Sequence, residues 1–293
     1  MAAPLDGVRI VSIAQNVPGP VALARLVAEG ATAIKIEPPG GDPLRTLCLP
    51  WYRELHRGIT VHSIDLKSRQ GRARLTRLLD RAQLFLASQR PAALARLGLD
   101  VDTIRHAHPH IRWLNIVGDT SEPDRAGHDL TYQARAGLAG RELPRTLLAD
   151  LFGAERVVSA AVLLLRRSAP AHEQVGLAQA LETVRSPLRF GVTAEGGPLG
   201  GRLPTYRIYE TRRGLVAVAA LEPHFRERLY QALDLPEGHA LADVMRSRTA
   251  LQWERWAARL DLPLARIADV RPLRGRVRKR RPATIAGNGH SQR

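Results

Sequence analysis

Apolar segments rich in β-branched residues alternate with helical segments over the first 117 residues, and this alternation constrains the fold more than any other feature of the sequence. Strands that are separated by helices form parallel sheets with helices on both faces. The expected strands are 7–14, 33–37, 60–66, 83–88 and 111–117, and the expected helices between them are 21–29, 68–81 and 91–97. The sequence therefore predicts an α/β fold with a Rossmann-like parallel sheet, whose ligands usually bind beyond the carboxyl ends of the strands.

The pattern changes after residue 118. A long apolar helix is expected over residues 151–167, a β-hairpin over 206–220 and an amphipathic helix over 222–235. These elements divide the chain into a large α/β domain at 1–180, a smaller α+β domain at 181–262, a return strand at 263–270 and a flexible basic tail at 271–293.

Composition excludes several classes of protein. The single cysteine, Cys48, excludes an internal disulfide framework, and no cluster of Cys and His has the spacing of a zinc site. We see no export signal at the N-terminus and no stretch near the roughly 18 apolar residues of a membrane span. Neither a Gly-x-Gly-x-x-Gly motif nor a P-loop occurs. We therefore expect a soluble, cytoplasmic protein without a metal and without ordinary dinucleotide chemistry.

The charge balance points to an anionic partner. The chain has 44 lysines and arginines against 28 aspartates and glutamates, a surplus of 16 positive charges. Such a surplus attracts anions over long range, and both nucleic acid and a phosphorylated cofactor are candidates. Part of it lies in the tail, at Arg271, Arg274, Arg276, Arg278, Lys279, Arg280 and Arg281. A tail of this kind is usually a solvated end that favours solubility.

Asp150 is the first candidate for chemistry. It ends the segment Leu147 to Asp150 and comes directly before the long apolar helix. From its position alone, the commoner role of its carboxylate would be to accept hydrogen bonds from the first amides of that helix. The chemical alternative is that the carboxylate attacks an activated carbonyl or removes the acidic proton beside one.

His128 and Glu222 are two further candidates. His128-Asp129 follows a glycine and precedes a helical stretch, so Asp129 could be a helix cap with His128 exposed beside it, or His128 could be an acid or base. Glu222 follows an apolar strand and precedes Pro223, which suits the first turn of a helix. A carboxylate at a helix start is favourable without any catalytic role.

A series of short motifs occurs in a characteristic order between residues 4 and 268. The motifs are Pro18-Gly19-Pro20, Ile34 to Asp42, Ile64-Asp65-Leu66-Lys67, Arg90-Pro91 with Leu97-Gly98-Leu99, Ala126-Gly127-His128-Asp129, Leu147 to Asp150, and Ala220-Leu221-Glu222-Pro223 with Phe225. This series resembles the family III CoA-transferases of the CaiB/BaiF type, which include carnitine and formyl CoA-transferases and α-methylacyl-CoA racemases. Pro18, the Ala-Gly-His-Asp segment and Glu222 resemble the racemase branch most closely.

The resemblance implies an acyl-CoA enzyme with two alternative reactions. In the racemase branch, His128 supported by Glu222 would act on one face of the acyl α-carbon and Asp150 on the other, so that one group removes the proton and the other returns it. In the transferase branch, Asp150 would instead be a nucleophile that passes CoA from an acyl-CoA to a carboxylate through an anhydride and an enzyme-bound thioester.

The resemblance also implies a binding groove for coenzyme A and an intertwined homodimer. The residues expected along the groove are Ile64, Asp65, Leu66, Lys67, Gly127, Asp129 and Tyr132, with Arg90 near the nucleotide phosphates. The chain departs from the family pattern in the short segments after Val117 and Gly137 and in Pro38, where racemases often have a cofactor-binding arginine. The remaining alternative is therefore a catalytically degenerate member or an anion-binding module.

Overall fold

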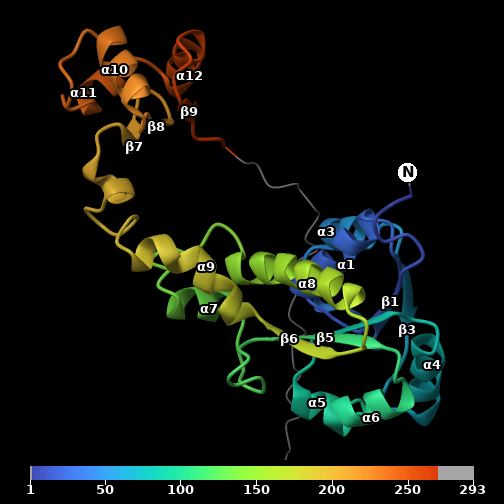
Figure 1. The fold of residues 1–293 in the computed structure, drawn as a ribbon. Helices are drawn as coiled ribbons and strands as arrows, with labels where there is room; N and C mark the ends of the chain where they lie inside the picture. The colour runs from blue at the N-terminus through green and yellow to red at the C-terminus, as the bar shows by residue number, and fades with distance from the viewer. Residues whose placement is uncertain (1, 270–293) are drawn as a thin grey trace, which may run out of the picture.

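The computed structural model describes residues 2–269, which form a large and a small lobe (Figure 1). A six-stranded parallel sheet organises the large lobe, with the strand order β3-β2-β1-β4-β5-β6. The strands are β1 Arg9–Ser12, β2 Thr32–Glu37, β3 Thr60–Ser63, β4 Leu84–Ala87, β5 Arg112–Val117 and β6 His172–Gly176. The predicted parallel α/β sheet is confirmed. Because all six strands run in one direction, their carboxyl ends meet at one edge.

Helices cover both faces of this sheet. The helices of the large lobe are α1 Pro18–Ala28, α2 Pro43–Leu47, α3 Leu49–Leu55, α4 Arg69–Leu79, α5 Pro91–Arg96, α6 Val101–Ala107, α7 Asp129–Arg135, α8 Leu148–Arg166 and α9 Leu177–Arg189. One buried cluster joins α1, α8 and α9 to the sheet, and a second joins α4, α5 and α6 to the opposite face. Ser68 caps α4 as the sequence predicts, because its hydroxyl accepts a hydrogen bond from the amide of Gly71.

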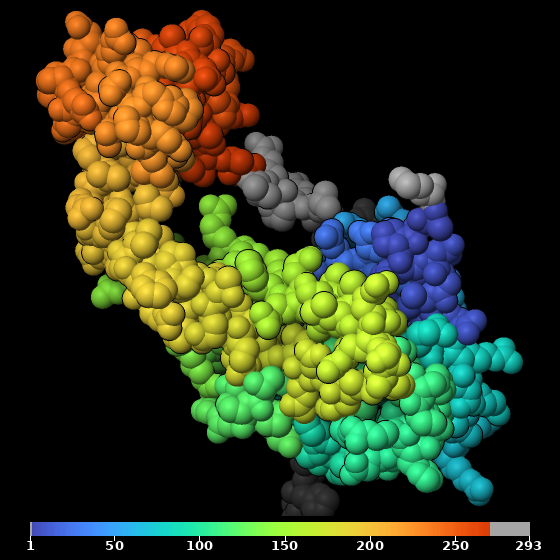
Figure 2. Space-filling model, viewed as in Figure 1, coloured from blue at the N-terminus to red at the C-terminus, as the bar shows by residue number. Residues whose placement is uncertain are grey.

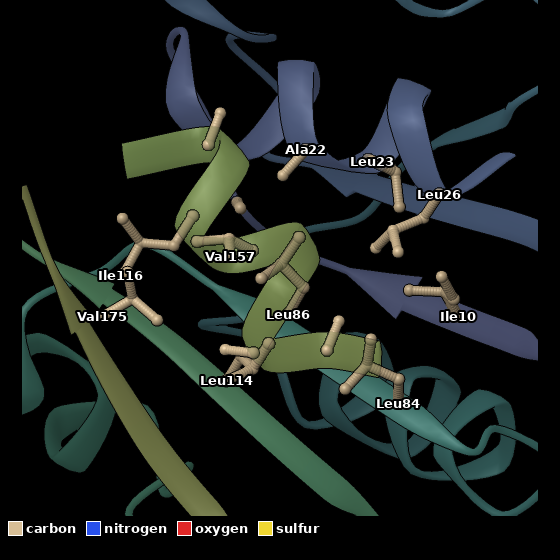
Figure 3. Close-up of a cluster of buried hydrophobic side chains, with 14 of the residues drawn as sticks. Ile10, Ala22, Leu23, Leu26, Leu84, Leu86, Leu114, Ile116, Val157 and Val175 are labelled. Carbon is tan, nitrogen blue, oxygen red and sulfur yellow. The ribbon is translucent and has the colours of Figure 1, made fainter. Parts of the chain in front are cut away.

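The packing of α8 places the start of that helix at the carboxyl edge of the sheet. Figure 3 shows Val157 of α8 beside Ala22 of α1 and above strand residues such as Leu86 and Leu114. All four side chains are fully buried. The close fit of α8 against both α1 and the sheet therefore fixes its first turn, where the candidate residue Asp150 lies.

The small lobe has a core of its own. Its antiparallel sheet has the order β7-β8-β9, with β7 Tyr206–Glu210, β8 Leu215–Ala219 and β9 Leu264–Arg266. The helices α10 Pro223–Ala232, α11 Ala242–Met245 and α12 Ala250–Arg259 pack on it around Leu229 and Trp253. Residues 190–205 join it to α9, and Figure 2 shows this segment as a narrower connection between two bodies.

Several local expectations differ from the structure. The long helix begins at Leu148 and not after Asp150, because Leu147 is its N-cap. The predicted boundary after residue 180 falls inside α9, and the predicted return strand at 263–270 overlaps β9, which pairs with β8. The elements α2, α3, α6, α9, α11, α12 and β6 were not predicted. The helices α2, α3, α6 and α11 are short, and β6 begins with three polar residues. The basic tail lies outside the described residues.

No helix in residues 2–269 is both long and apolar enough to span a bilayer.

Candidate active site

The loops after β1, β4 and β5 meet at the carboxyl edge of the sheet and enclose a cavity of about 120 Å³. This is the edge at which parallel sheets usually bind their ligands. The residues that line the cavity are Gln15, Asn16, Pro18, Ser88, Arg90, Ile116, Val117, Gly118, Pro123, Arg125, Gly127, His128, Tyr132, Asp150 and Leu177. The tertiary structure therefore brings five predicted residues together: Arg90, Gly127, His128, Tyr132 and Asp150.

Asp150 lies in the first turn of α8 and does not cap the helix. Its backbone amide donates to Asp129 Oδ1 at 3.1 Å, so a carboxylate from α7 satisfies this amide. The Asp150 carboxylate has no hydrogen-bond partner within residues 2–269, and it lines the cavity. The capping interpretation of Asp150 is thus wrong, because the helix starts two residues earlier and leaves the side chain free to meet a ligand.

The environment of Asp150 penalises its charge. Burial, and then the negative charge of Asp129, raises the pKa of Asp150 to about 7. A carboxyl group with this pKa is present in both protonation states at neutral pH, which suits proton transfer. Perturbed carboxyl groups in clefts are frequent at functional sites.

Asp129 is a buried group that accepts two hydrogen bonds. One of its oxygens accepts from Gln133 Nε2 at 2.6 Å and the other accepts from the amide of Asp150. The first bond lies within α7 and the second joins α7 to α8, and the cofactor-binding role of Asp129 stays a prediction. His128, the N-cap of α7, is exposed and lines the cavity.

Tyr132 closes one wall of the cavity. A Cβ at Gly118 or Gly127 would collide with its hydroxyl, so glycine is required at both positions for the ring to lie there. Burial, and then the nearby Asp150, raises the pKa of Tyr132. Tyr132 thus remains a neutral phenol beside the candidate carboxyl group.

The other predicted cofactor residues follow β3 at the same edge but do not line the cavity. Asp65 and Lys67 are exposed, and Asp65 Oδ1 accepts from the amide of Lys67 at 2.9 Å. Leu66 is half-buried. The side chain of Ile64 is buried in the core, so only its backbone could face a ligand.

Glu222 does not join the cavity. It is the exposed N-cap of α10 in the small lobe, with Pro223 in the first helical turn as expected. The structure therefore separates Glu222 from His128 and Asp150 within one chain.

Four polar residues of the cavity were not predicted from the sequence: Gln15, Asn16, Ser88 and Arg125. Gln15 and Asn16 follow β1, and Ser88 follows β4. The general rule that ligands bind at the carboxyl ends of strands would have indicated these three. Arg125 lies in an irregular loop that gives no such signal.

One group of residue types that bind metals is buried beside the cavity. The ligand atoms of Glu37, Asp42 and His56 lie within 4.8 Å of one another. The ammonium group of Lys35 already contacts all three, at 3.2 Å from Glu37 Oε1, 2.5 Å from Asp42 Oδ2 and 2.8 Å from His56 Nε2. The Lys35 ammonium group therefore occupies the position between these three side chains that a metal ion would take.

Comparison with known proteins gives the family. The pattern that defines CoA-transferase family III matches residues 5–275. The chain belongs to this family. A probable fatty acyl-CoA transferase of Mycobacterium tuberculosis, Rv3272, is 35% identical over 149 residues, which are 47% of this chain and 38% of that protein. The human alpha-methylacyl-CoA racemase is 27% identical over 290 residues, which cover 85% of this chain and 74% of the racemase.

Solved structures of family III proteins share the fold. A crystal structure of Rv3272 has a TM-score of 0.78 at 24% identity and covers 90% of this chain and 84% of that one. The crystal structure of a CaiB/BaiF family protein from Brucella suis has a TM-score of 0.77 at 22% identity, and the match covers 92% of this chain and 85% of that one. These likenesses confirm the two-lobed architecture predicted for the family.

Proposed function

We propose that this family III protein acts on acyl-CoA thioesters and that Asp150 is the group that meets the acyl part. The observation that carries the proposal is the Asp150 carboxyl, which has a pKa of about 7 and no hydrogen-bond partner among residues 2–269, in a cavity that His128 and Arg90 also line. The names of the family III relatives support the substrate class, since they include an acyl-CoA transferase and an acyl-CoA racemase.

In the racemase form of the proposal, Asp150 and His128 work as an acid and base pair on the α-carbon. Both line one cavity, which is the minimum that proton removal by one and return by the other requires. Incubation with a 2-methylacyl-CoA in deuterated water should place deuterium at the α-carbon. Asp150→Asn and His128→Ala should each reduce this exchange by about a hundredfold or more, as expected for loss of a general acid or base.

In the transferase form, the Asp150 carboxylate attacks the thioester carbonyl and CoA leaves as the thiolate, which gives a mixed anhydride. Mass spectrometry of protein quenched with acyl-CoA should then find an adduct on the peptide that contains Asp150. His128→Ala should not abolish this adduct, in contrast to its effect on α-proton exchange. An Asp150→Asn protein that keeps full activity would sink both forms.

The pKa of Asp150 separates the two forms further. Nucleophilic attack needs the carboxylate, so kcat/KM for transfer should rise as the pH passes through about 7. When His128 removes the proton and Asp150 returns one, the reaction needs protonated Asp150 and should slow above that pH. Rates measured from pH 5.5 to 8.5 distinguish these outcomes.

For coenzyme A we propose a path along the carboxyl edge from the loop after β3 to the cavity. Asp65, Leu66, Lys67 and the backbone of Ile64 would lie at one end, with Gly127 and Tyr132 at the other. Lys67→Ala and Arg90→Ala should each weaken CoA binding, because both side chains are exposed cations that can meet phosphates. Isothermal titration calorimetry with CoA tests this, with the exposed Arg156→Ala as the control.

The proposed support of His128 by Glu222 requires a homodimer in which a second chain brings its small lobe to the cavity. Co-expression of Asp150→Asn with Glu222→Gln provides the test, because a mixed dimer would contain one cavity with both native residues. Activity that returns in the mixture but in neither variant alone supports the dimer. Two inactive variants that stay inactive together contradict it.

A further inference from the structure

Lys35 and Asp42 are charged residues whose side chains are fully buried. Lys35 lies on β2, and its side chain is 0% exposed. Its ammonium contacts Asp42 Oδ2, Glu37 Oε1 and His56 Nε2 at 2.5, 3.2 and 2.8 Å. An unpaired charge at this depth would be strongly destabilising, so the three acceptors are what allow the lysine to remain charged there.

The neighbours of Lys35 have their protonation fixed by geometry. His56 Nδ1 lies 2.6 Å from the carbonyl oxygen of Tyr52, and a carbonyl can only accept, so Nδ1 carries the proton. His56 Nε2 is therefore the acceptor for Lys35. Glu37 also accepts from the hydroxyl of Tyr52 at 2.8 Å. Lys35, Glu37, Asp42, Tyr52 and His56 form one buried network, called the Lys35 network below.

Asp42 connects the Lys35 network to the active-site cavity. While Oδ2 contacts Lys35, Oδ1 accepts from the backbone amides of Leu44 at 2.9 Å and Asn16 at 3.1 Å. The bond to Leu44 caps α2, which is an ordinary structural role. The bond to Asn16 spans 26 residues of chain and reaches the loop between β1 and α1.

Asn16 needs such an anchor. Its φ is +66°, a left-handed conformation that asparagine tolerates better than most residues but that still costs free energy. The backbone amide of its neighbour Gln15 donates a hydrogen bond to Ser88 Oγ at 2.9 Å. Gln15, Asn16 and Ser88 all line the cavity, so two backbone hydrogen bonds determine how this loop faces the ligand.

We propose that Asp42 is a positioning residue of the active site, which holds the Asn16 backbone in its left-handed conformation while Lys35 neutralises and orients the Asp42 carboxylate. The proposal rests on the proposed function only in naming the cavity as the reaction site. It assigns a role at a distance to two residues, Lys35 and Asp42, that do not line the cavity themselves.

Two substitutions of Asp42 separate positioning from plain stability. Asp42→Asn keeps an oxygen for the amides of Asn16 and Leu44 but removes the charge that Lys35 needs. Asp42→Ala removes both the acceptor oxygen and the charge. The matched control is Asp100→Ala, which removes another N-cap aspartate, that of α6, whose Oδ1 accepts from Thr103 and not from a cavity loop.

The first readout is hydrogen exchange at the Asn16 amide, followed by NMR, because it does not depend on turnover. Asp42→Ala should speed this exchange at least tenfold, whereas Asp42→Asn and Asp100→Ala should leave it within about threefold of the wild type. If Asp42→Ala does not fold, Asp42→Ser replaces it. The serine side chain is one bond shorter than that of aspartate, so its hydroxyl should not reach the Asn16 amide as the carboxylate does.

The second readout is turnover of an acyl-CoA. Asp42→Ala should lower kcat at least tenfold with KM within about threefold, and Asp42→Asn should keep kcat although it unfolds at a lower temperature. Unchanged exchange at Asn16 in Asp42→Ala overturns the proposal, and so does a loss of kcat that follows lost stability equally in both variants. A wild-type protein inactive on every thioester tested would overturn the proposed function alone, because the exchange result still decides whether Asp42 anchors Asn16.

Discussion

Asp150 and Asp129 illustrate how two carboxyl groups a short distance apart take different roles. Both oxygens of Asp129 accept hydrogen bonds, one from Gln133 and one from the backbone amide of Asp150. No residue in the described range 2–269 donates a hydrogen bond to the Asp150 carboxyl, and burial and the charge of Asp129 raise its pKa. Asp129 therefore has a structural role between α7 and α8, whereas the Asp150 carboxyl, with a pKa of about 7, can gain or lose a proton near neutral pH.

The raised pKa of Asp150 makes the stability of the protein depend on pH. The folded value of about 7 lies above the unfolded value of 3.8, so the folded state binds the proton more strongly. The free energy of unfolding therefore falls as the pH rises between these values. Asp150→Asn, which cannot ionise, should gain thermal stability over the wild type from pH 4 to pH 7, and the gain should then level off.

Thermal unfolding followed by circular dichroism at pH 4.5, 6 and 8 measures this effect. Asp100 is a useful opposite case, because hydrogen bonds from Thr103 lower its pKa. The loss of stability in Asp100→Asn relative to the wild type should therefore be the same at all three pH values, because the effect of a lowered pKa develops only below the unfolded value of 3.8. A difference between Asp150→Asn and the wild type that is the same at all three pH values would contradict the first expectation.

At the scale of elements, α8 determines where the candidate carboxyl group lies. The helix packs against α1 on one side and the sheet on the other, and its first turn is joined to α7 through Asp129. Ala154, Val157 and Ala161 recur at helical spacing on its buried face. Small residues on this face allow the close approach that brings Asp150 to the carboxyl edge of the sheet.

Truncation of this face should be costly. Val157→Ala removes two buried methyl groups between α1 and the sheet and should lower the free energy of unfolding by about 2 kcal/mol. Arg156→Ala, on the exposed side of the same turn, should change it by less than about 0.5 kcal/mol. Urea denaturation of the two variants measures both free energies of unfolding. Equal losses in Val157→Ala and Arg156→Ala would show that the buried contact of Val157 does not hold α8 in place.

At the scale of the whole molecule, the two lobes have separate hydrophobic cores. The large lobe packs around its parallel sheet, and the small lobe packs around Leu229 and Trp253. The connecting residues 190–205 are narrow, as Figure 2 shows. Lobes that share little core can unfold independently and can move relative to each other.

Calorimetry should therefore show two unfolding transitions. Leu229→Ala leaves a cavity in the small lobe and should lower one of them, with a cost of about 2–5 kcal/mol, while the other stays in place. Leu23→Ala in the large lobe should do the reverse. A single transition that moves with both substitutions would mean that the lobes unfold as one unit.

The amino-acid sequence by itself determined the local structure and the family. Periodicity predicted the first five strands of the sheet, the hairpin β7–β8 and helix α10, because alternation and amphipathic spacing reflect which face of an element is buried. The ordered motifs predicted the CoA-transferase family, which the match over residues 5–275 confirms.

Only the tertiary structure decided which of these residues meet. Strand order and helix packing bring Asn16, Ser88, His128 and Asp150 to one cavity, and they leave Glu222 in another lobe. The same packing buries Lys35 against His56, 21 residues away, and lets Asp129 bind the amide that Asp150 would otherwise expose. Sequence patterns report local preferences and burial, whereas the pKa of Asp150 depends on distances between residues that only the packed chain brings together.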